Sequence, residues 1–145
     1  MKKPDSLRRA LTDAVSHLRA NPDKLHIFVD DGNMVSTLAP SLSWEYRYTL
    51  NVMVTDFSGD QDLLMAAILA WMRSNQPDVM ANPDLRNSSV TFEAVILNNG
   101  TADISIDLKL TERIVVSPSG DNMLVVAEPE PENPEWRDDY WLSER

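Results

Sequence analysis

Hydrophobic and polar residues alternate with period two through the middle of the chain. Between Ser43 and Thr55, one side of the alternation is polar and the other carries Trp44, Tyr46, Tyr48, Leu50, Val52 and Val54. Such a run, rich in aromatic and β-branched residues, predicts a half-buried β-strand. Its thirteen residues, at about 3.3 Å each, would span roughly 43 Å, which is longer than most strands. We therefore expect this strand to extend beyond its own core and to contact another subunit.

Two further segments alternate in the same way. Val90 to Leu97 and Ile104 to Thr111 flank the sequence Asn98-Asn99-Gly100-Thr101, which is typical of a β-hairpin turn. From Glu112 to Val116 the alternation loses its phase, which predicts a bulge or the end of the strand. After a turn, Met123 to Ala127 is expected to form a last short strand.

Two segments have helical periodicity. The first helix is expected to be capped by Asp5 or Ser6 and to end at Asn21-Pro22. The second is expected from Asp60 to Ser74. The apolar stripe of the first helix consists of Leu7, Leu11, Ala14 and Leu18, widened by Ala10 and Val15.

The segment before the long strand contains turn-forming residues. Leu25 to Val29 and Met34 to Leu38 have strand-forming character, and Asp30-Asp31-Gly32-Asn33 lies between them. This tetrapeptide lacks the alternating ligands and the closing glutamate of a calcium loop, so we interpret it as the turn of a β-hairpin. All elements together predict an α+β domain over residues 1–127. Two helices would pack on one face of a mainly antiparallel sheet of about four to six strands.

Composition is that of an ordinary globular domain. Hydrophobic residues make up 43% and charged residues 25% of the 145 residues, which is enough for one core. The 23 acidic and 13 basic residues give a formal net charge of −10, which argues against sequence-independent nucleic-acid binding; we expect no sequence-specific binding either. The absence of cysteine excludes disulfides and thiolate metal sites. The longest apolar run, Leu63 to Met72, is too short to span a bilayer, so no membrane partner is expected.

Candidate catalytic and metal-binding residues are few. His17 and His26 have no triad-like partner near them in sequence, and we interpret both as surface or interface residues. Asp56, Asp60 and Asp62 lie at the entrance to the second helix, where carboxylates cap free amides and oppose the helix dipole. We therefore expect no metal, no cofactor and no enzymatic activity. A small hydrolase that uses the three aspartates stays an alternative.

Aromatic residues are the main interface candidates. The second helix is apolar on all sides through Leu63 to Met72, including Trp71, so one side should lie on the sheet and another against the first helix or a second subunit. Trp44, Tyr46 and Tyr48 are expected in the core or in an interface. The alternative is that they line a ligand pocket, in a monomeric or dimeric ligand-binding or regulatory domain.

The C-terminal segment, residues 128–145, differs from the rest of the chain. It has seven acidic and two basic residues, a net charge of −5, and prolines that keep its first part extended. Trp136, Tyr140 and Trp141 follow at a spacing that places them on one face of a helix. Two tryptophans in an acidic segment are typical of an anchor that binds a groove. We expect an arm that docks in trans on another protein of the assembly, the alternative being that it folds back on its own domain.

Several segments resemble one known family. Lys3 to Leu11 (Lys-Pro-Asp-Ser-Leu-Arg-Arg-Ala-Leu) and Leu42 to Asn51 (Leu-Ser-Trp-Glu-Tyr-Arg-Tyr-Thr-Leu-Asn) are similar to the start and centre of the tail completion protein R family of temperate, contractile-tailed bacteriophages. The similarity runs to about Val116, and its motifs are structural rather than catalytic. Further matching segments are Val29 to Gly32, Val54 to Gly59 and Leu69 to Pro77.

The resemblance implies a structural virion assembly protein that completes or terminates the phage tail. It would reside in the virion tail after assembly in the host bacterial cytoplasm. Tail terminators as a class are α+β proteins that form sixfold rings, matching the symmetry of the tube. By that analogy we expect a homo-oligomeric ring that caps the tail tube, prepares the head–tail junction and contacts other tail or head-completion proteins.

Overall fold

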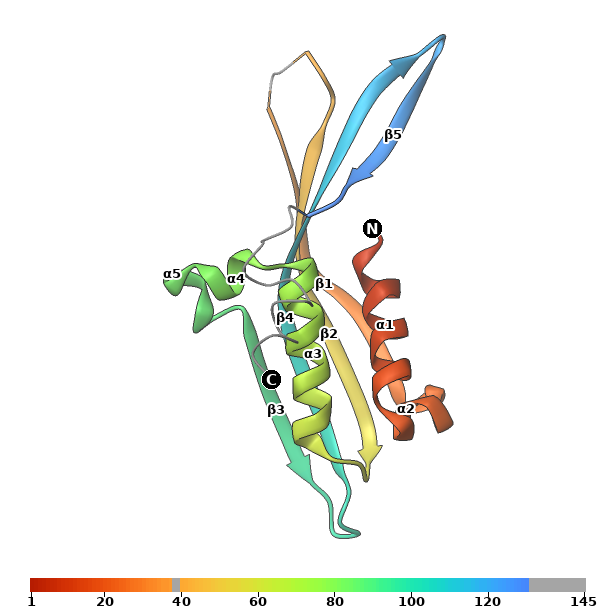
Figure 1. The fold of residues 1–145 in the computed structure, drawn as a ribbon, viewed down its shortest axis with the longest axis vertical. Helices are drawn as coiled ribbons and strands as arrows, with labels where there is room; N and C mark the ends of the chain where they lie inside the picture. Colours follow the sequence, from red (N-terminus) through yellow and green to blue (C-terminus); the bar gives the residue numbers. More distant parts are fainter. Residues whose placement is uncertain (38–39, 131–145) are drawn as a thin grey trace, which may run out of the picture.

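A computed structural model of the chain describes residues 1–37 and 40–130. Its strands form one antiparallel sheet in the order β1-β2-β4-β3, and β5 pairs with the far end of β4 (Figure 1). This architecture confirms the predicted α+β class. The strands are β1 (Leu25–Ser36), β2 (Trp44–Phe57), β3 (Val90–Ile96), β4 (Ala102–Ser119) and β5 (Asn122–Glu128).

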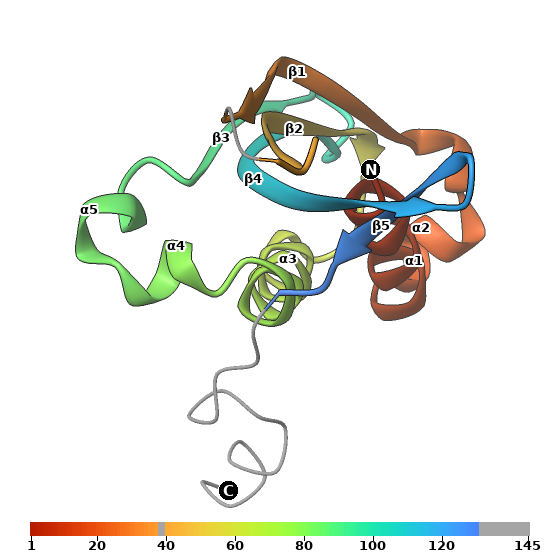
Figure 2. The same cartoon turned by 90° about the horizontal axis from the view of Figure 1, so that it is seen from above.

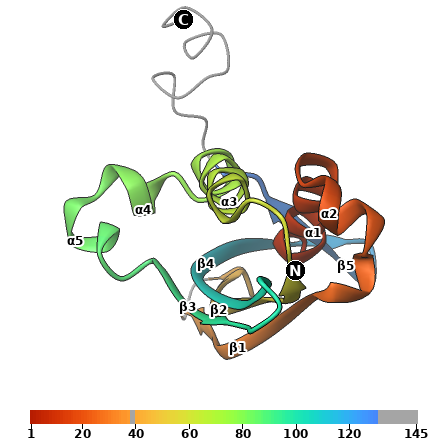
Figure 3. The ribbon, with the colours of Figure 1, turned by 90° about the horizontal axis from the view of Figure 1, so that it is seen from below.

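Helices cover one face of this sheet. In the views along the sheet, α1 and α3 lie side by side on that face, and α4 and α5 stand to one side of α3 (Figures 2 and 3). No helix in the described ranges is long and apolar enough to cross a membrane. The helices are α1 (Lys3–Ala14), α2 (Ser16–Ala20), α3 (Gln61–Asn75), α4 (Asp78–Ala81) and α5 (Pro83–Arg86), with a 3-10 turn, η1 (Pro22–Lys24), before β1.

The core lies between α1, α3 and the inward face of β2 and β4. The long alternating strand is confirmed, since its even-numbered side chains from Tyr48 to Val54 are buried. Burying each such aliphatic side chain contributes about 1.5–3 kcal/mol. The main partners of this strand in the core are Ile104, Ile106, Leu108 and Leu110 from β4, Leu64, Ile68 and Met72 from α3, and Leu7 and Leu11 from α1.

The start of the first helix differs from the prediction. Neither Asp5 nor Ser6 caps it, because α1 begins at Lys3 and no cap from a neighbouring side chain is present. The carboxylate of Glu112 in β4 binds the first amides of the helix instead. The helix is also interrupted at Val15, whose extended backbone separates α1 from α2.

The predicted hairpin between Leu25 and Leu38 is wrong. Strand β1 runs straight on from Leu25 to Ser36 and pairs with β2 on both sides of Asp31-Gly32. The pairing shifts register between Asp30 and Asn33, and Asp31 has a positive φ of 49°. The turn-forming residues therefore make a β-bulge, which needs the same backbone freedom as a turn but does not reverse the chain.

The predicted bulge or strand end at Glu112 to Val116 is also wrong. The inward positions of β4 stay in phase past this point, and Glu112, Ile114 and Val116 are all buried. The alternation only looks broken in sequence because a glutamate occupies an inward position. Strand β4 continues to Ser119 and turns into β5 through Gly120, whose φ of 61° suits a glycine.

A bulge does occur at the end of β2. Register with β4 shifts between Val54 and Phe57, and Asp56 has a φ of 49°. Because side chains of a strand alternate, the extra residue turns Phe57 onto the inward face, where it is fully buried. The strand thus ends two residues later than the pattern predicts.

Asp60 should supply about 1 kcal/mol of stability as the cap of α3. Its carboxylate accepts the amides of Asp62 (2.9 Å) and Leu63 (3.4 Å), as the cap prediction requires. Asp60→Ala should therefore lower the free energy of unfolding in urea by about 1 kcal/mol. The matched control is Gln61→Ala, the exposed neighbour, which should stay within about 0.5 kcal/mol of the unchanged protein. A large rise in melting temperature with calcium, lost in Asp56→Ala, would contradict this capping role.

Candidate functional site

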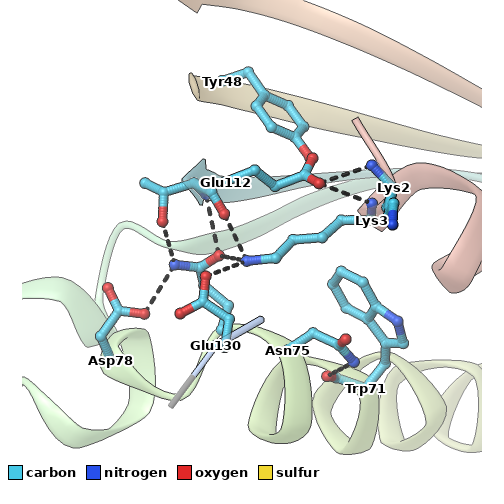
Figure 4. A network of polar contacts seen from close by, with 10 residues as sticks. Lys2, Lys3, Tyr48, Trp71, Asn75, Asp78, Glu112 and Glu130 are labelled. Atoms are coloured by element: carbon cyan, nitrogen blue, oxygen red, sulfur yellow. Dashed lines mark hydrogen bonds and ion pairs between the residues drawn. The ribbon is translucent and has the colours of Figure 1, made fainter. Parts of the chain in front are cut away.

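A buried carboxylate lies where the helical layer meets the sheet. Glu112 is only 5% exposed on the inward face of β4, and it accepts the hydroxyl of Tyr48 at 2.6 Å (Figure 4). The backbone amides of Lys2 and Lys3 donate to its other oxygen at 2.7 and 3.3 Å. These amides form the N-terminus of α1, so the carboxylate caps the helix and interacts with the positive end of its dipole.

Lys3 and Gln76 extend this network to α3. The Lys3 ammonium donates to Gln76 Oε1 and the Thr111 carbonyl, both at 2.6 Å, and forms an ion pair with Glu130 at 2.8 Å. Gln76, directly after α3, is almost fully buried. Its amide nitrogen donates to Thr111 Oγ1 (2.8 Å) and Asp78 Oδ1 (2.9 Å), and its oxygen accepts the Thr111 amide (3.0 Å). One cluster thereby joins α1, α3 and the end of β5 to β4.

The network keeps its donors in place over a wide pH range. Burial raises the pKa of the Tyr48 hydroxyl well above its ordinary value, and the hydrogen bond to Glu112 and the charge of that carboxylate raise it further. The hydroxyl therefore remains a donor to Glu112. Since both oxygens of Glu112 have partners, the arrangement serves to hold layers together.

The three aspartates near α3 have separate contacts. Asp60 caps the helix, whereas Asp62 is exposed in the first turn. Asp56 accepts the hydroxyl of Thr101 at 2.6 Å and the amide of Asn99 at 3.4 Å, and these two bonds, followed by nearby Lys24, hold the pKa of its carboxyl below the ordinary value. Over the described residues, no three His, Cys, Asp or Glu side chains are grouped so that they could hold a metal ion.

The two histidines lie in different surroundings. His17, in α2, is half-buried and packs edge-on against Phe57, with ring centroids 5.0 Å apart. His26 is exposed on β1 and stacks on Phe28 at 6.4 Å. Neither is joined to the Glu112 network.

The aromatic interface candidates divide into two groups. Tyr48 and Trp71 are buried inside the subunit, and the Trp71 indole nitrogen donates to Ser6 of α1 at 3.0 Å. Trp44 and Tyr46 are half-buried and pack edge-to-face at 5.6 Å. Neither of the two cavities described below is lined by these four residues. Their interface role stays a prediction.

The remaining candidates, Trp136, Tyr140 and Trp141, lie outside the described residues. The described chain ends at Glu130, which the ion pair fixes to Lys3. A shallow cavity surrounds this point, with Ser6 and Asn75 among its lining residues. The arm therefore begins beside α1 and the C-terminal end of α3.

Part of the sheet projects beyond the helices (Figure 1). We call this part the projecting sheet and define it as residues 33–36, 44–47 and 113–128. It exposes large apolar side chains, among them Met34 (61%), Met123 (62%) and Leu124 (53%). The length of the alternating strand β2 predicted that the sheet extends beyond the core. The short apolar sequence of β5 did not indicate that this strand is exposed. The other large exposed hydrophobic residues of this part are Val35, Val115, Val125 and Val126.

A second apolar surface lies beside β3. We call it the β3 groove. It has a volume of about 430 Å³, and Arg86 is the one charged residue in its lining. The sequence predicted that α3 is apolar on all sides and gave no sign of a groove beside β3. Its apolar lining consists of Met65, Ile68, Leu69, Val79, Met80, Val90 and Phe92.

Comparison with known proteins agrees with the segments that carry the resemblance. The sequence model of the P2 phage tail completion protein R (GpR) family matches residues 1–133. This chain belongs to that family. It is 57% identical over 136 residues to tail completion protein R of Escherichia phage P2, covering 92% of this chain and 88% of the relative. No solved structure matches the chain. Membership of the R family supports a role in phage tail assembly.

Glu112 should be essential to the stability of this R-family protein. Glu112→Leu leaves the Tyr48 hydroxyl and two α1 amides without their acceptor, at about 1–3 kcal/mol for each unsatisfied group. We expect the free energy of unfolding in urea to fall by about 3 kcal/mol or more. The matched control is Glu93→Leu, the same change at an exposed position of β3, which should stay within about 0.5 kcal/mol. Equal losses in the two variants would contradict the role assigned to Glu112.

Tyr48 should make the R-family fold sensitive to alkali. A raised pKa in the folded state means that the stabilising contribution is complete below the unfolded pKa of about 10 and is lost as the pH rises above it. Between pH 10 and 11 the unchanged protein should therefore lose about 1 kcal/mol more than Tyr48→Phe. Urea unfolding at pH 8, 10 and 11 measures this, and identical pH slopes for the two proteins would refute it.

Proposed function

We propose that this protein completes the phage tail as a closed ring of identical subunits that caps the tail tube and prepares its junction with the head. Sixfold symmetry follows by analogy with tail terminators as a class, whose rings match the tube. Membership of the R family supports the tail role. The exposed apolar side chains of the projecting sheet are the observation that supports assembly into a ring.

The projecting sheet is poorly suited to an isolated subunit. Several large apolar side chains on β5 are about half exposed or more, and contiguous apolar surface of this kind marks interaction sites. The free edges of β1 and β3 can also pair with further strands. Contact between the projecting sheet of one copy and a different surface of the next is heterologous, and such contacts close into rings when the rotation permits.

The charge of the protein suits this position. A net charge of −10 on each subunit makes a ring that repels nucleic acid, so that DNA can pass through its centre without sticking. The ring would present one face to the tube and the other to a head-side protein. Assembly would take place in the host bacterial cytoplasm, and the protein would remain in the virion tail.

Leu124 should be needed for assembly but not for folding. It is 53% exposed on β5, so Leu124→Glu places a charge on the projecting sheet without removing a core contact. Self-association should shift to at least tenfold higher concentration, measured by sedimentation with and without tail-tube protein and by electron microscopy for closed rings. The unfolding midpoint should not change.

The control for this change lies at the opposite end of the molecule. Ala20→Glu, an exposed position at the end of α2, should assemble like the unchanged protein. Two outcomes would overturn the proposal. One is an unchanged protein that stays monomeric at every concentration and is absent from tail particles, and the other is normal assembly of Leu124→Glu.

A further inference from the structure

The β3 groove lies where the helical layer stops short of the edge of the sheet. Phe92 in β3 pairs with Ile106 in β4, so both side chains are on the helix-covered face. Ile106 is fully buried, yet Phe92 is 64% exposed. On α3, Leu69 lines the same groove and is 44% exposed. One more segment packed between α3 and β3 would therefore complete the helical layer.

The described chain ends near this groove. The Lys3 ammonium binds both Glu130 and Gln76, so the last described residue lies next to the C-terminal end of α3 (Figure 4). Gln76 in turn donates to Asp78, the first residue of α4. The next residue of α4, Val79, lines the groove. The arm thus begins only a few side chains away from the groove of its own subunit.

The rest of the chain is long enough to enter this groove. Residues 131–135 contain two prolines and span about 15 Å when extended, at about 3.1 Å each. A helix such as α3 is about 10–12 Å across, so Trp136 and the residues after it reach the groove without strain. A linker this short gives the segment an effective concentration on the order of millimolar at its own groove. The groove of another copy competes only at a comparable protein concentration.

The segment Trp136 to Leu142 matches the groove in chemistry. Its three aromatic side chains are spaced to share one face of a helix. They suit a lining that is apolar except for Arg86, and that arginine suits the carboxylates of Asp138 and Asp139. The preceding Asn133-Pro134-Glu135 has the cap residue, the first-turn proline and the carboxylate that are typical of a helix start.

We propose that residues Trp136 to Leu142 bind the β3 groove of their own subunit as a short helix beside α3. The aromatic face of the segment covers Leu69 and Phe92, and its carboxylates lie near Arg86. The inference does not depend on the ring, and it favours an arm that folds back on its own domain over one that docks in trans. A filled groove presents the polar side of the segment to neighbouring subunits in place of an apolar lining.

Thiol protection in the full-length chain tests this placement. The chain has no cysteine, so Leu69→Cys provides a single thiol in the groove. Its alkylation by a water-soluble maleimide is compared with that of the same chain carrying Trp141→Ala. We expect the thiol to react at least tenfold more slowly when Trp141 is present. A hundredfold dilution of the protein should leave this protection unchanged, because docking within one chain does not depend on concentration.

The matched control moves the thiol out of the groove. Ala70→Cys is exposed on the same helix but does not line the groove, so Trp141→Ala should change its alkylation rate less than twofold. A tenfold change at position 70 as well would mean that Trp141 stabilises the helix as a whole, and would overturn the proposal. Trp136→Ala is a second variant, with the same expected effect at position 69 and none at position 70.

Two further outcomes would contradict docking in the same subunit. Equal rates at position 69 with and without the two tryptophans would show that the segment does not use the groove. Protection that disappears on dilution would show that it binds the groove of another copy. Neither outcome bears on the ring, which the assembly of Leu124→Glu tests separately.

Discussion

A single buried carboxylate holds the sheet and the helical layer together. Glu112 occupies a position that the pattern of β4 would give to an apolar residue, and an unpaired charge there would cost several kcal/mol. Its donors come from Tyr48 in β2 and from the first amides of α1. Helix α1 has no side-chain cap from its own sequence, so its first amides depend on the Glu112 carboxylate as acceptor. The buried carboxylate depends in turn on these amides as donors. Neither layer is complete without the other.

The same network marks the limit of the covered sheet. Helix α1 begins at Lys3 and α3 ends at Asn75, and both ends are tied to β4 at Thr111 and Glu112. Beyond this line β4 continues to Ser119 without a helix over it. The polar side chains at the limit are buried but satisfied, whereas several apolar side chains beyond it, such as Met123 and Leu124, remain exposed. The projecting sheet is thus a consequence of where the two helices stop.

Local pattern predicted most elements and missed what depends on distant partners. Alternation identified β2, β3 and β4, and helical period identified α3 to within one residue, because these signals are contained in neighbouring residues. The role of Glu112 as a buried helix cap could not be predicted, because the amides that bind it are more than one hundred residues away in sequence. Asp30 to Asn33 suit a turn and a bulge equally, and pairing with β2 selects the bulge. The β3 groove was missed for a related reason: only the packing shows that α3 leaves β3 uncovered.

On the proposed ring, association is a balance between apolar surface and charge. The projecting sheet and the β3 groove lie on different parts of the subunit. A contact between two subunits therefore need not join two copies of the same surface. Contacts of this kind can also grow into open filaments when the rotation does not close. A charge of −10 on each subunit opposes such growth at low ionic strength and is screened within about 10 Å at 0.1 M salt. In the proposed ring, this repulsion would keep free subunits apart, and the end of the tube would supply the symmetry that selects a closed ring over a filament.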